Sequence, residues 1–164
     1  MRAKTVLPTF QDFYDAAPEE IKRYVDRCGD TPQSKAWHPE GDVKKHTEIV
    51  FARARNTGDP DLVLAAFLHD LGKADTTTKD PVRPDVYHAT YHDVVSTKLA
   101  EKHREWILSM GGDPEKVLYL VSQHMRAKDY GKMRPAKQEA MRRHEHFGLL
   151  QKFTKLDGMV GPKA

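Results

Sequence analysis

The sequence predicts an all-α fold, a single-domain helical bundle, and two observations carry this prediction. Apolar residues recur at the three- and four-residue spacing of amphipathic helices, and residues that cap or open helices stand in front of these segments. No alternating strand pattern of useful length, internal repeat or low-complexity tract is visible. The chain has 164 residues, enough for one domain and too few for two ordinary ones, so we expect one domain over residues 1–164.

Capping residues, prolines and glycines divide the chain into elements. Asp59-Pro60 and Asp113-Pro114 each place a capping carboxylate before a proline at the first helical position, and Gly72 is well placed to end the helix that follows Asp59. Polar, proline-punctuated loops are expected over residues 34–41 and 74–87. The expected helices are one capped by Thr9, one from Pro18 to Cys28, one capped by Asp42 that carries His46, one starting at Asp59-Pro60, one from about His88 to Met110, one from about Pro114 to Met125, and one from about Pro135 to Val160 that is interrupted near Gly148.

An ionisable pair, His69-Asp70, lies in the apolar stretch 65–73, where a buried helix end is expected. Burying such groups is costly unless something compensates them. A metal cation is the usual compensation, because a neutral imidazole and a carboxylate supply a nitrogen and an oxygen donor. The pair therefore predicts a metal site with further ligands elsewhere in the chain.

Those further ligands are sought among His and Asp residues on the apolar stripe of their own helices. Four residues besides the pair pass this test: His46, His92, His124 and Asp157. Donors that point inward from different helices can converge in the core of a bundle. A single inward histidine can equally be a hydrogen-bonded core residue, so both readings stay open for each of them.

The remaining histidines are expected to be structural or exposed. His103 also fits an apolar face but has no other feature of a ligand, so we interpret it as structural. His144 and His146 lie in a polar, basic stretch and are two residues apart, so they cannot share one helix face. They are interpreted as surface residues.

Composition excludes several classes of protein. Charged residues make up 31% of the chain and hydrophobic ones 38%, no apolar run has the length of a membrane span, and no secretory signal is visible, so we expect a cytoplasmic protein with no membrane partner. Cys28 is the only cysteine, which excludes an internal disulfide and a thiolate zinc cluster. We expect its thiol to be inert, and only His and carboxylate side chains remain as metal ligands.

Positive charge is concentrated in residues 126–143, although the whole chain carries only +3. The basic residues of this segment are Arg126, Lys128, Lys132, Arg134, Lys137, Arg142 and Arg143. Such a segment suits a phosphate-rich ligand, and it is also what a solvated helix face looks like. Arg126 and Lys128 are the candidate substrate-binding residues within it.

The order His46, His69-Asp70, Asp157 resembles the H...HD...D pattern of the HD-domain metal-dependent phosphohydrolases. The resemblance covers about residues 37–160, behind N-terminal helices at 9–28. Within that superfamily, the run His-Pro-Glu-Gly-Asp-Val at 38–43 and Tyr-His-Asp at 91–93 resemble the HD domain attached to bacterial CCA-adding tRNA nucleotidyltransferases. No nucleotidyltransferase half precedes the domain here, so we expect no CCA-adding activity.

The resemblance implies a ligand set. His46, His69, Asp70 and Asp157 would hold one metal, and His92 and His124 fall where two-metal members place further ligands, with Asp70 as the bridge. The family segment around His92 often has Gly-His-Glu where this chain has Tyr-His-Asp. His88, one turn earlier, is therefore an alternative or additional ligand. Mixed His and carboxylate ligands suit Mn, Fe, Co, Ni or Zn, as one ion or two, better than Mg alone.

The chemistry expected from this set is phosphoryl hydrolysis, with Asp70 at the centre. Lys73 is suited to neutralise a phosphate oxygen, although it can also be a solvated lysine at a helix end. His88 is the candidate acid for the leaving group.

The leading hypothesis is a phosphohydrolase of nucleotides or RNA ends, including 2',3'-cyclic phosphates and 2'-phosphates, so the partner is a phosphate-containing small molecule or an RNA end. Free mononucleotides, including dNTPs, are the competing substrates. Two other classes stay open: a di-iron oxygenase resembling inositol oxygenase, and a non-catalytic module whose metal only stabilises it or which only binds nucleic acid.

Overall fold

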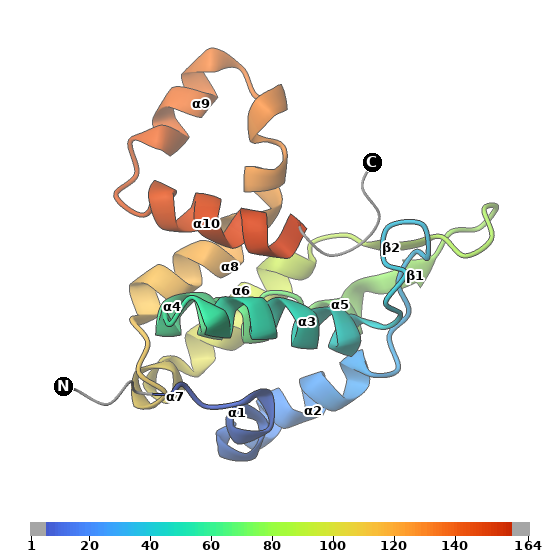
Figure 1. The fold of residues 1–164 in the computed structure, drawn as a ribbon. Helices are drawn as coiled ribbons and strands as arrows, with labels where there is room; N and C mark the ends of the chain where they lie inside the picture. The colour runs from blue at the N-terminus through green and yellow to red at the C-terminus, as the bar shows by residue number, and fades with distance from the viewer. Residues whose placement is uncertain (1–5, 159–164) are drawn as a thin grey trace.

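Helices form nearly all of the regular structure in the computed structural model, which describes residues 6–158 (Figure 1). The elements are α1 (Phe10–Ala16), α2 (Glu19–Cys28), α3 (Val43–Asn56), α4 (Pro60–Leu68), α5 (Lys73–Thr76), β1 (Thr77–Lys79), β2 (Tyr87–Ala89), α6 (His92–Lys102), α7 (Arg104–Ser109), α8 (Pro114–Lys128), a 3-10 turn (Tyr130–Lys132), α9 (Pro135–Arg142) and α10 (Phe147–Gly158). The predicted all-α class is confirmed, since the sheet is one short antiparallel pair of strands. No helix within residues 6–158 has the length and apolar character that a membrane crossing requires.

Helix α4 is the centre of the packing. Every residue from Leu62 to Leu68 is buried, because α3, α8 and α10 cover it from different sides. A helix that is apolar all round is expected in such a central position. The capping carboxylate of Asp59 accepts a hydrogen bond from the Asp61 amide at 2.9 Å, which gives α4 the predicted start. The core helix therefore has a defined beginning and a fully buried end.

The N-terminal helices close one end of this core. Thr9 and Asp12 form a reciprocal capping box at the start of α1. Aromatic rings then join α1, α3, α4 and α7: Phe13 lies 5.2 Å from Phe51, 5.7 Å from Phe67 and 6.2 Å from Trp106, measured between ring centroids. Residues 9–28 are thus part of the same apolar core as the central helix.

Cys28 and His103 lie where the sequence predicts. Cys28 is buried at the end of α2, and burial raises the pKa of its thiol to about 12, in line with an unreactive side chain. His103 joins the break between α6 and α7 to α2, because its Nε2 lies 2.8 Å from Glu20 Oε1.

The helix expected from about His88 to Met110 starts later, at His92, and is divided at His103 into α6 and α7. The loop expected over residues 74–87 includes most of α5, all of β1 and the start of β2. Residues 77–79 pair with residues 87–89 as a hairpin, and α6 begins only at His92, after Tyr91 adopts a left-handed backbone with φ of 62°. Asp80 holds the hairpin turn: its carboxylate accepts from the amides of Val82 and Arg83 and from the His88 side chain. These bonds hold the pKa of Asp80 below its ordinary value.

Two further boundaries differ from the prediction, and a third agrees with it. Helix α8 continues to Lys128, past its expected end near Met125. The last predicted helix is interrupted close to Gly148, as expected, at residues 143–146. The expected end of that helix, Val160, lies outside the described residues. Gly72 does not end α4, which stops at Leu68. It has an ordinary helical φ of −61° at the start of α5, so its lack of a side chain matters for another reason.

Gly72 allows α6 to approach closely. A Cβ atom there would lie 2.3 Å from the carbonyl oxygen of His92 and 2.9 Å from the amide of Ser96. We expect Gly72→Ala to lower the free energy of unfolding by about 2 kcal/mol, because backbone atoms cannot move aside as a flexible side chain can. Chemical denaturation would measure this. Gly148→Ala is the control, since nothing lies within 4 Å of a Cβ at that position, and equal stability of the two variants would contradict the expectation.

Candidate metal centre

The pair His69-Asp70 lies directly after the central helix. His69 follows Leu68, and its amide still donates to Ala65 O, so the pair is held in helical geometry at the end of α4. His69 is fully buried and Asp70 is 3% exposed. The structure therefore shows the buried ionisable pair that the sequence predicts.

All six predicted metal ligands lie together in the core. They come from different elements: His46 from α3, His69 and Asp70 from the end of α4, His92 from α6, His124 from α8 and Asp157 from α10. None is more than 3% exposed. Segments far apart in the sequence thus converge at one point of the bundle.

Oxygen Oδ2 of Asp70 faces the first group of ligands. It lies 3.2 Å from His69 Nε2 and 3.5 Å from His46 Nε2. Asp157 completes this group, since its Oδ1 lies 2.9 Å from His46 Nε2 and 3.4 Å from His69 Nε2. Two imidazole nitrogens and two carboxylates therefore surround one small volume.

The other oxygen of Asp70 faces a second group. Its Oδ1 lies 3.1 Å from His92 Nε2 and 3.6 Å from His124 Nε2, and these two nitrogens are 3.2 Å apart. His46, His69 and Asp70 have ligand atoms close enough to hold a metal ion, and so do Asp70, His92 and His124. Asp70, which presents one oxygen to each set, would lie between two ions if each set held one.

Backbone carbonyls orient three of the histidines. Each of these rings donates its Nδ1–H to the carbonyl three residues earlier: His69 to Ala66 at 2.8 Å, His92 to Ala89 at 2.9 Å and His124 to Val121 at 2.7 Å. Because a carbonyl only accepts, these hydrogen bonds assign a proton to Nδ1 and leave Nε2 facing Asp70. Such a bond from the other ring nitrogen to a carbonyl is typical of histidines that bind metals.

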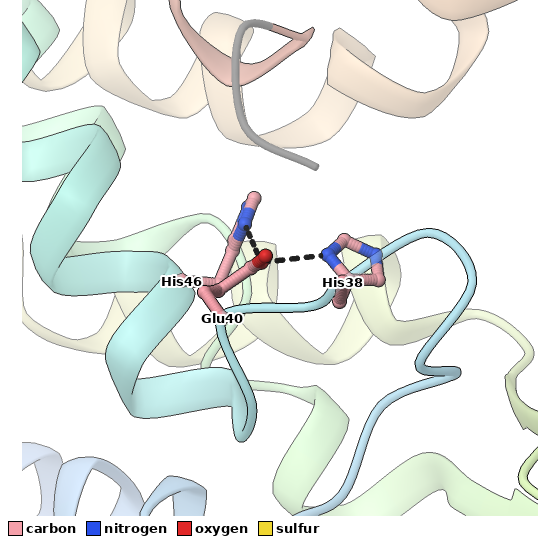
Figure 2. Close-up of side chains that lie close together, drawn as sticks. All are labelled: His38, Glu40 and His46. Carbon is pink, nitrogen blue, oxygen red and sulfur yellow. Dashed lines mark hydrogen bonds and ion pairs between the residues drawn. The ribbon is translucent and has the colours of Figure 1, made fainter. Parts of the chain in front are cut away.

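Glu40 orients the fourth histidine and was missed as a functional residue in the sequence (Figure 2). Its Oε1 lies 3.1 Å from His46 Nδ1 and 3.0 Å from His38 Nδ1. The carboxylate fixes the His46 ring so that Nε2 faces Asp157 and Asp70. Residues 38–43 contributed only to the family resemblance. The available signal was a carboxylate close to the start of the helix that carries a candidate ligand.

The electrostatics of the centre favour a cation. Among the described residues, His69 Nε2 is buried and makes no hydrogen bond. Burial by itself would lower the pKa of His69, but the charges of Asp70 and Asp157 outweigh it and raise this pKa to about 10. The same negative potential attracts a divalent cation, so the donor set and its field both fit a metal ion.

Two lysines lie at the edge of the centre. Lys73 Nζ is 3.3 Å from Asp70 Oδ2, and Lys128 Nζ is 3.0 Å from Asp157 Oδ2. Although burial opposes ionisation, His69 and these lysines hold the pKa of both carboxyl groups well below the ordinary value. The carboxylates therefore stay ionised, as metal binding requires.

A cavity of about 240 Å³ opens beside the centre. Lys73 and His92 line its inner part, and His88 also borders it. His88 lies in β2 with its side chain 46% exposed, and its Nε2 is 2.8 Å from Asp80 Oδ2. It is His92, and not His88, whose nitrogen lies beside Asp70.

Arg126 lies apart from the ligand cluster. Its guanidinium donates to Gln123 Oε1 at 3.0 Å and borders a separate hollow with Lys137 and His144. His144 is exposed there and stacks on Tyr119, with ring centroids 3.9 Å apart. Of the three predicted substrate-binding residues, the structure thus brings Lys73 and Lys128 to the centre, and Arg126 to a neighbouring surface.

Comparison with known families agrees with this geometry. The family model of the HD domain matches residues 43–150, more than half of the chain. The chain therefore belongs to the HD domain family, as the ordered motif predicts. Proteins of this family are typically metal-dependent hydrolases that bind divalent metals, and the cluster described above is able to hold such an ion.

The chain is also similar to part of several multifunctional CCA proteins. It is 33% identical over 134 residues to that of Aromatoleum aromaticum, which covers 77% of this chain and 32% of the relative. It is 45% identical over 56 residues to that of Alkalilimnicola ehrlichii, covering 34% of this chain and 14% of the relative. It is 36% identical over 81 residues to that of Vibrio cholerae, covering 49% of this chain and 20% of the relative. The chain spans a third or less of these relatives, and no solved structure matches it significantly.

The contact of Glu40 with His46 predicts an effect on metal affinity. We expect Glu40→Gln to weaken binding of a divalent metal by about 10- to 100-fold, because the amide orients the imidazole less firmly and lowers its basicity. Competition with a chromogenic chelator would measure the dissociation constant. Glu48→Gln, at an exposed position on α3, the helix that carries His46, should leave the dissociation constant unchanged. An unchanged affinity of the Glu40 variant would show that Glu40 has only a structural role.

Proposed function

We propose that this chain is a divalent-metal-dependent phosphohydrolase that acts on nucleotides or RNA ends, such as 2',3'-cyclic phosphates and 2'-phosphates. The observation that carries the proposal is the position of Asp70, whose two oxygens each face a histidine group while a lysine lies beside the same carboxylate. Candidate metal ligands and a cationic side chain at one point suit a phosphoryl group, which carries negative charge on several oxygens.

The residues that would hold the metal divide into two sets. His46, His69, Asp70 and Asp157 would bind one ion, and Asp70 with His92 and His124 a second. Such ions, when bound, supply Lewis-acid chemistry that polarises phosphoryl oxygens and lowers the pKa of water. Mn, Fe, Co, Ni and Zn are the candidate metals, because imidazole and carboxylate ligands suit them.

The side chains of the protein bind and orient the substrate. Lys73 donates to Gln33 Oε1 at 2.9 Å and lies close to Asp70, so its ammonium group is held at the inner end of the cavity. There it is placed to bind a non-bridging phosphate oxygen as a point charge. Lys128 supplies a second positive charge beside Asp157. His88, at the border of the cavity, remains the proposed proton donor to the leaving group.

An RNA end is the substrate favoured by the surroundings of the site. The similar proteins are named multifunctional CCA proteins, and the basic residues of α8 and α9 continue outward from His124. Arg126 and Lys137 lie on this surface, where they would contact further phosphates of a polynucleotide and not the reacting one. A free dNTP or other mononucleotide would use the cavity without this surface. Either substrate is in keeping with a cytoplasmic protein.

The six-ligand set is also compatible with a di-iron oxygenase. The histidines and carboxylates alone do not separate the two chemistries. Lysines beside both ligand carboxylates favour a phosphate substrate, because an oxygenase reaction does not need two cationic side chains there.

Hydrolysis of a defined panel tests the proposal. We expect the purified protein, with its metal identified, to hydrolyse members of a panel of cyclic, 2'-, 3'- and 5'-phosphates, and a chelator to abolish this activity. His69→Ala and Asp70→Ala should each lower kcat/KM by about a thousand-fold, since the metal contributes several kcal/mol to transition-state stabilisation. Leu108→Ala, which alters an exposed side chain on α7, is the control. Full activity in chelator would contradict the proposal, and bound iron with oxygen consumption would assign the protein to the oxygenases.

Lys73 has a separate expected effect. Replacing it by methionine removes the charge and keeps the aliphatic stem, so we expect KM for phosphate substrates to rise by about ten-fold while the bound metal is retained. Steady-state kinetics and metal analysis of the same preparation would measure both. Lys79→Met, at an exposed position in β1, should change neither quantity. Loss of metal from the Lys73 variant would instead assign this lysine to the integrity of the centre.

A further inference from the structure

The cavity beside the metal centre has walls from three parts of the chain. The loop before α3 contributes Gln33 and Trp37, the hairpin contributes Tyr87 and His88, and the metal centre contributes Lys73 and His92. Its volume of about 240 Å³ is somewhat below the range of about 300–1,000 Å³ common for sites of drug-sized ligands. A space of this size suits one nucleoside attached to the phosphate and not a longer ligand.

Hydrogen bonds hold the loop wall in place before any ligand binds. The amide of Tyr87 donates to Ser34 Oγ at 2.9 Å, and the Ser34 hydroxyl donates to Tyr87 O at 3.3 Å. Gln33 is tied to the metal centre in turn by its bond from Lys73. The loop and the hairpin thus form a preorganised pocket, which reduces the entropy lost when a ligand binds.

Gln33 offers an unused hydrogen-bond donor at this pocket. The residue is only 8% exposed, and its Oε1 is occupied by Lys73. Its Nε2 is buried and has no hydrogen-bond partner among the described residues. Buried amide donors are rarely left unsatisfied, because their desolvation is costly. Because Gln33 is among the residues that line the cavity, an acceptor on a ligand there is the candidate partner for this group.

Trp37 offers a flat apolar face at the same pocket. Its side chain is 59% exposed, whereas the other tryptophan, Trp106, is 8% exposed in the aromatic core. Met125, also partly exposed, borders the cavity from α8. An exposed indole beside a cavity is a suitable platform for a heterocyclic base, because every base has a π face that stacks on it.

We propose that this cavity is a nucleobase-binding subsite, in which a base stacks on Trp37 and accepts a hydrogen bond from Gln33 Nε2. The inference rests on the proposed function for the position of the phosphate, which Lys73 and the metal centre would hold at the inner end. It makes the terminal nucleoside, and not the phosphate alone, the recognised part of the substrate. Simple phosphate monoesters would then bind more weakly than nucleotides.

Binding measured without turnover tests the subsite. In the metal-containing Trp106→Phe protein, Trp37 is the single tryptophan, and we expect adenosine, which has no phosphate to hydrolyse, to quench its fluorescence saturably. Ribose, which has no base, should bind at least about ten-fold more weakly than adenosine. Equal affinity of the two ligands would overturn the inference.

Variants separate the two contacts. Trp37→Ala should raise the dissociation constant of adenosine, measured by calorimetry, by about ten-fold, because one stacked base is lost. Trp37→Phe should restore most of the affinity. Gln33→Glu keeps the acceptor for Lys73 but removes the donor, so it should weaken binding of the uncharged probe adenosine. Leu108→Ala, which removes an exposed apolar side chain from α7, outside the cavity lining, is the control.

Failure of this inference can be told apart from failure of the proposed function. Hydrolysis of phosphate esters that is unaffected by Trp37→Ala, with no preference for a base, would overturn the subsite and leave the phosphohydrolase in place. Binding of adenosine that depends on Trp37, in a protein that hydrolyses none of the panel, would support the subsite alone.

Discussion

Two carboxylates buried in the core of a helical bundle are the constraint on which this structure depends. Asp70 and Asp157 are each 3% exposed, and a buried charge is tolerated only when opposite charge and hydrogen bonds compensate it. Imidazole nitrogens and one lysine lie within ion-pair distance of each. Because these partners come from α3, α5, α6 and α8, and the carboxylates from the end of α4 and from α10, the charged centre ties several helices together. A divalent cation would meet the same need with fewer groups.

The apolar part of the core serves this centre. Helix α4 is covered on all sides, so its last turn brings His69 and Asp70 to the middle of the bundle without exposing them. Gly72 then lets α6 approach within backbone contact, which places His92 against Asp70. Hydrogen bonds from the rings to backbone carbonyls and to Glu40 set the direction of each nitrogen. The orientation of the ligands is therefore built from ordinary helix packing and local hydrogen bonds.

The side of the metal centre that faces the cavity is built differently from the side that the helices bury. Helices bury the ligands, whereas the loop before α3 and the hairpin border the cavity that leads to them. Loops carry recognition in many proteins because a rigid scaffold can position them. Here Lys73 joins the scaffold to the loop through Gln33, and Ser34 joins the loop to the hairpin through Tyr87. The metal centre and the pocket wall are thus mechanically connected.

The sequence by itself determined the helical class, most helix starts and the six candidate metal ligands, which the structure brings together. Caps at Thr9, Asp42, Asp59 and Asp113 bond to amides two or three residues away, and helical periodicity fixes which face a side chain occupies, so both are readable locally. Only the tertiary structure decided that residues 87–89 form a strand, that His92 and not His88 lies beside Asp70, and that Glu40, Gln33 and Trp37 border the site. These features depend on strand pairing and on loop side chains that contact residues distant in the sequence. The helical periodicity of the sequence carries no information about such contacts.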